Sequence, residues 1–227
     1  MEPVDILDRM AKHFQNMIDE AFCLNIKLKI EGSEEYFNIN IENGNVLLED
    51  TASKNVDCTL VTSEEVLQKI HRGEITAFTA AGKAHVSDPA PLDWEIEGGY
   101  NPENMKNLYF FLMHFFNVQV PEKINLGEKY ARKVHGANAI PLYYNPGFRS
   151  AWYMVKKGEQ MNEPGDTDPF HQAIIVIEGK GYAKIGNKSV EIEKNESYYI
   201  PPKGDQVVWN DSEEPLVLIW LAWGDEA

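Results

Sequence analysis

Cysteine is scarce in this chain of 227 residues, which contains only Cys23 and Cys58. Two cysteines cannot form a disulfide framework, and both lie in apolar patterns, so we expect two buried free thiols. Basic residues are also few, because 21 lysines and arginines stand against 36 aspartates and glutamates. The resulting formal net charge of −15 disfavours nucleic acids and anionic membrane surfaces as partners.

Long apolar runs are missing too. No stretch reaches the roughly 18 apolar residues that a membrane-spanning helix needs, and no basic segment followed by an apolar one opens the sequence. Phosphate-binding loops, dinucleotide fingerprints and nucleophile motifs are not found, so hydrolases, kinases and dehydrogenases have no support. We therefore expect a soluble, cytoplasmic protein without a membrane span.

The first half of the chain has the pattern of a small sheet covered by helices. Apolar residues recur at helical spacing over residues 3–22, and alternating segments follow at 26–30 and 37–41. Residues 46–48 and 56–60 are expected to extend this antiparallel meander. A capping box at residues 62–65 predicts a helix that ends near Gly73, and residues 75–81 predict a helical turn before a strand at 82–86.

A further helix is expected to begin at Asn101-Pro102, and its residues 108–116 are apolar on almost every face. Such a helix is either buried on all sides or covers an apolar ligand. In the first interpretation its two faces pack on neighbouring domains. In the second, four residues line a hydrophobic cavity: Phe110, Phe111, Met113 and Phe115. We expect His114 to be a hydrogen-bonded core histidine.

The order of short motifs over residues 1 to about 118 resembles the sterol carrier protein type 2 domain. The matching segments are Asn43-Gly44, residues 57–60 with the sequence DCTL, and residues 73–83, which run from GEITAF to GK. This resemblance implies an apolar tunnel between sheet and helices that holds lipids or other hydrophobic small molecules. It places a ligand-binding domain at residues 1–120, followed by a partly helical linker at 121–138.

From residue 139 onward, short β-branched or aromatic segments alternate with turns, which predicts a small barrel. These segments are 140–144, 150–155, 173–177, 182–186, 189–193, 197–200 and 216–223. Together with the helical and sheet segments before them, they predict an α+β chain with two domains.

The order of features in this barrel resembles the two-part signature of cupins, G-x5-H-x-H-x3,4-E-x6-G and then G-x5-P-x-G-x2-H-x3-N. With Gly179 as the last glycine of the first part, the glutamate falls on Gln172 and the histidines on Asp168 and Asp166. The last histidine falls on Gln206 when counted from Pro201-Pro202 or from Asn210, and on Val207 when counted from Gly204. The resemblance implies a jelly-roll barrel at 139–227 that forms a homodimer.

None of the positions that match the cupin metal ligands is a histidine. Cupins hold iron, manganese, nickel or zinc through imidazoles, which give these metals their affinity. Oxygen atoms of Asp166, Asp168, Gln172 and Gln206 could hold only a hard cation, and weakly, so we expect no metal and no other cofactor. His171 alternates with Gln172 and is expected to point outward.

Two functions are compatible with this sequence. We favour the binding or carrying of a hydrophobic small molecule, lipid-like or polyketide-like, with Gln172, Gln206 and Trp209 as contacts in the barrel. The alternative is a metal-independent enzyme, a cyclase, isomerase or lyase with a hydrophobic substrate.

The enzyme hypothesis depends on Asp166 and Asp168. Alternation along a strand would place both carboxylates at the barrel mouth, where one acts as a general acid or base. The other interpretation of this segment is a polar surface loop whose aspartates cap backbone amides.

Overall fold

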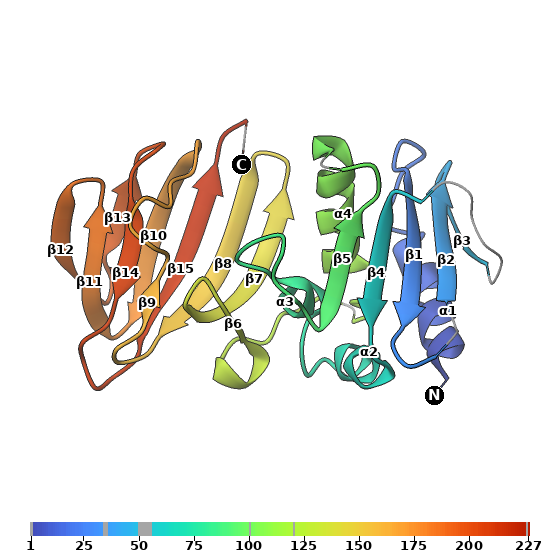
Figure 1. Cartoon of the computed structure of the whole chain (residues 1–227), viewed down its shortest axis with the longest axis horizontal. Helices are drawn as coiled ribbons and strands as arrows, with labels where there is room; N and C mark the ends of the chain where they lie inside the picture. Colours follow the sequence, from blue (N-terminus) through green and yellow to red (C-terminus); the bar gives the residue numbers. More distant parts are fainter. Residues whose placement is uncertain (1, 34–35, 50–55, 100, 120, 226) are drawn as a thin grey trace. The chain divides into compact units, whose positions relative to one another are not determined.

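The computed structural model describes residues 2–225 and 227, apart from residues 34–35, 50–55, 100 and 120 (Figure 1). The chain divides into two compact units. The first contains Met1–Ala81 and His85–Ile124, and the second contains Gly82–Ala84 and Asn125–Ala227. Residue 120, which we predicted as the end of the first domain, lies outside the described residues.

The first unit is built on a five-stranded sheet with the order β3-β2-β1-β4-β5. Its strands are β1 (Leu24–Ile30), β2 (Tyr36–Glu42), β3 (Asn45–Glu49), β4 (Cys58–Thr62) and β5 (Leu92–Ile96). The pairs β1–β2 and β2–β3 are antiparallel, as the Asn43-Gly44 turn predicts. The prediction that β4 extends this antiparallel meander was wrong. Strand β4 pairs with the edge of β1 opposite to β2 and runs parallel to β1.

The strand expected at residues 82–86 was also wrong. The Asp88 carboxylate accepts a hydrogen bond from the amide of His85 at 2.9 Å, and the amide of Asp88 donates to the carbonyl of His85 at 2.9 Å. These bonds close a turn, which competes with strand pairing. The sheet is completed by β5 instead, which pairs antiparallel with β4.

Four α-helices accompany this sheet in the described part of the first unit: α1 (Pro3–Phe14), α2 (Glu64–His71), α3 (Ala77–Ala81) and α4 (Pro102–His114). Ser63 caps α2 and Asn101 caps α4, which confirms both predicted starts. Helix α1 is shorter than the predicted 3–22, because Asp19 accepts the amides of Ala21 and Phe22 and holds a separate turn. Cys23 follows this turn and is exposed, so only Cys58 is the buried thiol that we expected.

The second unit consists of two sheets, drawn in yellow to red in Figure 1, with the orders β13-β10-β15-β8-β7-β6 and β12-β11-β14-β9. Their strands are β6 (Arg132–Val134), β7 (Ala137–Asn145), β8 (Phe148–Val155), β9 (Gln160–Met161), β10 (His171–Glu178), β11 (Lys180–Ile185), β12 (Lys188–Glu193), β13 (Ser197–Ile200), β14 (Gln206–Trp209) and β15 (Leu216–Trp223). The predicted strands are confirmed. The predicted linker was wrong in part, because β6 and the start of β7 lie within it and pair with each other.

The two sheets share one apolar core, which residues from alternate positions of both sheets form. Its larger members include Tyr153, Phe170, Ile174, Val208 and Trp220. Gly179 closes the tight connection after β10 with φ of +75°, and a Cβ at this position would lie 2.3 Å from the carbonyl oxygen of Pro215. Only glycine fits there, which supports its place as the last glycine of the cupin-like signature.

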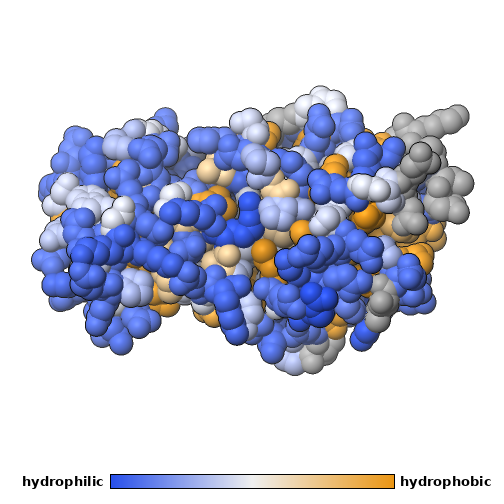
Figure 2. Space-filling view, turned by 60° about the horizontal axis from the view of Figure 1, so that its bottom comes forward, coloured by the Kyte–Doolittle hydropathy of each residue, from blue (hydrophilic) through white to orange (hydrophobic). Residues whose placement is uncertain are grey.

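The face of the molecule shown in Figure 2 is largely hydrophilic. On the face shown in Figure 2, hydrophobic residues form small separate groups among hydrophilic ones. Among the residues that the structure describes, no helix has the length and apolar character needed to cross a membrane.

Candidate functional site in the C-terminal barrel

Polar side chains enter the interior of the second unit at one end, where β10 and β14 begin. Gln172 is the second residue of β10 and is fully buried. It shares a face with Ile174 and Val176, which belong to the barrel core, so its side chain points inward. In register, Gln172 pairs with Ala222 of β15, and Ala222 pairs with Arg149 of β8. A small alanine therefore separates Gln172 from Arg149 on the inner face.

The orientation of the Gln172 amide is fixed by Trp220. The indole Nε1 of Trp220 donates a hydrogen bond to Oε1 of Gln172 at 2.7 Å. An indole N–H only donates, so the amide oxygen must face it and the amide NH2 must point elsewhere. Nε2 of Gln172 is buried and has no hydrogen-bond partner among the described residues. The barrel interior therefore contains an NH2 donor of fixed orientation without an acceptor among the described residues.

Gln206 also faces inward, which answers the question of register that the sequence left open. It shares a face of β14 with Val208, a member of the barrel core. Its Nε2 donates a hydrogen bond to Oδ2 of Asp168. Trp209 lies on the opposite face and stacks on Tyr182, with ring centroids 5.5 Å apart. The prediction that Trp209 and Gln206 share one binding surface was therefore wrong.

Asp168 is close to the buried hydroxyl of Tyr153 and is partly exposed. Burial, followed by the negative charge of Asp168, raises the pKa of Tyr153 well above its ordinary value. Tyr153 therefore keeps its proton and remains a hydrogen-bond donor at neutral pH. The guanidinium of Arg149 lies 5.2 Å from the ring centroid of Phe170 and 5.6 Å from that of Tyr144.

Asp166 does not join this group of side chains. It is exposed and lies in the loop before β10, where its Oδ2 accepts a hydrogen bond from the amide of Glu163 at 2.9 Å. Residues 166–169 are not in a strand, so alternation does not place Asp166 and Asp168 on one face. The expected carboxylate pair on a strand was wrong, and the loop interpretation describes Asp166 correctly.

The residues at the cupin ligand positions do not fit a metal ion. Asp166 accepts an amide of its own loop, and Asp168 accepts the amide of Gln206. Gln172 gives its oxygen to Trp220 and presents an NH2 group, which repels a cation. Within the described ranges, no three His, Cys, Asp or Glu side chains come together as a metal site.

His171 points outward, as alternation predicts. Its Nδ1 lies 2.7 Å from the hydroxyl of Tyr199, and its ring contacts those of Tyr199 and Trp223, with centroid distances of 6.0 and 5.9 Å, while the latter two rings lie 6.2 Å from each other. This aromatic group is exposed on the outer face of the six-stranded sheet. His171 is therefore not a ligand or base of the barrel interior.

The predicted ligand-lining residues of α4 belong to a cluster of aromatic rings in the first unit. Phe111 and Phe115 are fully buried, and both rings contact Phe14 of α1 at centroid distances of 5.7 and 5.6 Å. Phe110 contacts the same ring at 5.9 Å, whereas Met113 is partly buried. His114 lies 2.9 Å from Oε2 of Glu122, which agrees with a hydrogen-bonded histidine. These contacts account for the phenylalanines as core, and a ligand cavity at α4 stays a prediction.

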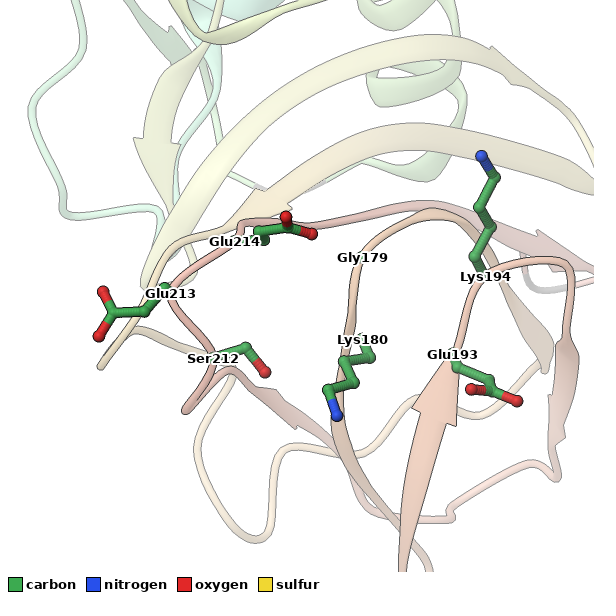
Figure 3. Close-up of a pocket in the computed structure, with 7 residues that line it drawn as sticks. All are labelled: Gly179, Lys180, Glu193, Lys194, Ser212, Glu213 and Glu214. Atoms are coloured by element: carbon green, nitrogen blue, oxygen red, sulfur yellow. The ribbon is translucent and has the colours of Figure 1, made fainter.

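An open hollow of about 540 Å³ lies at the opposite end of the second unit, near Gly179. It is lined by Gly179, Lys180, Glu193, Lys194, Ser212, Glu213 and Glu214. Figure 3 shows the charged side chains of Lys194, Glu213 and Lys180 pointing in different directions rather than toward one point. Glu213 forms an ion pair with Lys157. This hollow has no convergent polar groups and is not a candidate site.

Comparison with known proteins identifies a part of the second unit. Residues 151–222 match a protein-family model that is described as the cupin domain. These residues are a cupin domain. No curated protein matches the chain.

Several solved structures resemble parts of this chain. A cupin 2 conserved barrel domain protein from Salinispora arenicola is 20% identical, covers 45% of this chain and 88% of its own, and has a TM-score of 0.40. A protein from Photorhabdus luminescens is 18% identical, with coverages of 45% and 87% and a TM-score of 0.41. An RmlC-like cupin from Shewanella frigidimarina is 16% identical, with coverages of 43% and 82% and a TM-score of 0.37. The comparisons give no support for a sterol-carrier-like first domain, which stays a prediction.

Sequence reasoning missed two residues of the cupin interior, Arg149 and Phe170. Tyr153 and Trp220 were not among the predicted site residues either. Alternation along β8 predicts which face of that strand carries Tyr153, and alternation along β15 does the same for Trp220. Their approach to Asp168 and Gln172 depends on pairing between distant strands, for which the sequence has no local signal.

Proposed function

We propose that the cupin domain binds a small, largely apolar organic molecule inside its barrel. The observation that carries this proposal is the distribution of polar groups. Gln172, Gln206, Asp168 and Arg149 gather at one end, whereas most of the remaining interior is formed by the apolar core residues. Apolar walls with a few convergent polar groups are typical of sites for small organic ligands.

Binding without chemistry agrees better with this geometry than the enzyme alternative. A general acid or base formed by Asp166 and Asp168 needs both carboxylates in one site, but Asp166 is exposed and bonded to its own loop. Tyr153 is held in its protonated form, so it is not an activated base. A cyclase, isomerase or lyase activity would have to depend on Asp168 alone.

Native mass spectrometry of the full chain, purified without detergent, tests the proposal. A co-purified organic molecule is expected, and it should be lost when Ala222, between Gln172 and Arg149, is enlarged by Ala222→Leu. Ala173→Leu is the matched control, because Ala173 faces outward on the neighbouring strand β10. Both variants must keep the wild-type melting temperature within a few degrees. Equal ligand content in the two variants would contradict a site in the barrel.

Three further parts complete the proposal. A hydrophobic ligand in the first unit is supported by the resemblance to the sterol carrier protein type 2 domain. A cytoplasmic location is supported by the composition of the chain. A homodimer through the cupin domain is supported by the exposed Tyr199 and Trp223, which are 53% and 39% accessible on the outer sheet face. Sedimentation equilibrium should show a dimer for the wild type and a monomer for Trp223→Glu.

A further inference from the structure

Gln172 presents a hydrogen-bond donor to the interior of the cupin domain, at a position where the cupin signature has an acceptor that holds a metal ion. The match to the signature places its glutamate, an acceptor, at Gln172. Here the acceptor atom of the side chain is occupied by the indole of Trp220, and the atom left over is a donor, Nε2. A buried donor without a partner destabilises the empty barrel, so a ligand that supplies an acceptor removes this penalty on binding.

We propose that this position recognises an acceptor oxygen of the ligand, a carbonyl or a carboxylate, through Nε2 of Gln172. The proposal rests on the proposed function and names the head group of the same ligand. The charges at this barrel end agree with it: Arg149 places a positive charge beyond Ala222 in the same row of the inner face, and the Asp168 carboxylate already accepts the amide of Gln206. An ammonium or other donor head group would face Nε2 without a partner.

Trp220 is a positioning residue in this scheme, because it acts through the amide of Gln172. Without the indole N–H, the amide of Gln172 is free to turn over and present its oxygen. Trp220→Phe should therefore change which head group is preferred and not only how tightly a ligand binds.

Four probes with one apolar body test the head group: phenylacetate, benzyl methyl ketone, 2-phenylethylammonium and ethylbenzene. Binding to the full chain is measured by calorimetry, after removal of any co-purified molecule. For the wild type, phenylacetate or the ketone should bind at least about tenfold more tightly than the ammonium compound, which corresponds to one hydrogen bond of about 1.4 kcal/mol. Gln172→Met should remove this preference, and Trp220→Phe should reduce it toward equality. Gln160→Met, at an exposed glutamine of the same domain, is the matched control.

The outcomes separate the two proposals. If ethylbenzene binds as tightly as phenylacetate and the ketone, and Gln172→Met changes nothing, an apolar ligand site remains but the head-group proposal is wrong. If the ammonium compound binds most tightly, the head-group proposal is also wrong. If none of the four probes binds and no molecule co-purifies, both proposals are overturned. A crystal structure that shows only an ordered water on Nε2 in the presence of bound phenylacetate would likewise contradict the recognition of an acceptor oxygen.

Discussion

The indole nitrogen of Trp220 and the side-chain oxygen of Gln172 lie 2.7 Å apart, although the two residues are 48 positions apart in the sequence. Pairing of β10 with β15 brings them together. Both side chains are buried in the cupin domain. This bond decides which half of the amide faces the interior, and so it decides what the barrel can recognise.

Loss of this bond should be visible in stability. Trp220→Phe leaves Oε1 of Gln172 without its donor and removes part of a buried ring, so we expect the free energy of unfolding to fall by about 2–4 kcal/mol. Trp209→Phe in the same domain is the control, because Trp209 is only half-buried and its substitution should cost less than about 1 kcal/mol. Chemical denaturation followed by circular dichroism measures both. Similar losses in the two variants would argue against the buried bond.

Metal content is a second test. The donor set of the cupin interior, with two carboxylates already bonded to amide groups and a glutamine NH2, predicts well under one transition-metal ion per chain. Elemental analysis after dialysis against iron, nickel and zinc measures this. A stoichiometric ion would show that the side chains rearrange to bind it.

Asn210, at the end of the cupin-like signature, has a structural role. It is fully buried, and its amide donates to the carbonyls of Val155 at 3.0 Å and Glu214 at 2.8 Å, while its oxygen accepts the amide of Ser212 at 2.7 Å. Asn210→Ala should therefore lower the free energy of unfolding by about 2–4 kcal/mol. Asn187→Ala, at an exposed asparagine of the same domain, should change it by less than about 1 kcal/mol, as measured by denaturant titration.

The pH dependence of stability should include a contribution from Asp205. A hydrogen bond from the ammonium of Lys184 holds the pKa of Asp205 below its ordinary value, and the amide of Gly165 adds a second bond at 3.1 Å. The folded-state pKa is depressed, so this stabilisation is present above the unfolded-state pKa of about 3.9 and is lost as the pH falls below it.

Asp205→Asn should therefore lower stability at pH 7 but lose less stability than the wild type between pH 5 and pH 3. Thermal denaturation across this range measures both slopes. Asp211→Asn, at an exposed aspartate of the same domain, is the control. Parallel curves for Asp205→Asn and the wild type would contradict the ion pair.

The phenylalanine cluster of the first unit predicts a large loss of stability for Phe111→Ala. The ring is fully buried and contacts the rings of Phe14, Phe115 and Phe116 at 5.7, 4.4 and 5.6 Å. Its removal should cost about 3–5 kcal/mol. Phe148→Ala, where the ring is 38% accessible, should cost much less in the same denaturation experiment. A small loss for Phe111→Ala would instead favour a cavity that a ligand fills in the wild type.

The sequence predicted those parts of the fold that local patterns control. Strands β7, β8, β10 to β13 and β15 follow from alternation and turn residues, and the starts of α2 and α4 follow from Ser63 and Asn101. It did not predict that β4 runs parallel to β1, because that pairing joins distant segments and has no local signal. The end of α1 was missed because the carboxylate of Asp19, rather than a glycine or proline, starts a new turn.

The candidate site was predicted in part. The family signature placed Gln172 on the inward face of its strand, where the structure has it, but it left open whether Gln206 or Val207 points inward. The spacing of the signature gave the wrong geometry for Asp166, because the segment before β10 is a loop. The partner of Gln172 could not be predicted, since Trp220 lies on the neighbouring strand β15, and only the folded sheet defines the register between β10 and β15.

The parallel pairing of β1 with β4 has a consequence for the order in which the first unit forms during synthesis. As the chain leaves the ribosome, β1, β2 and β3 can pair as hairpins at once, but one edge of β1 stays open until residues 58–62 have emerged. The strand with this open edge carries the side chains of Ile26, Leu28 and Ile30 on one face, and these are buried in the finished sheet. An open apolar edge invites pairing with another chain. The nascent first unit should therefore depend on chaperones most strongly between the emergence of β1 and that of β4.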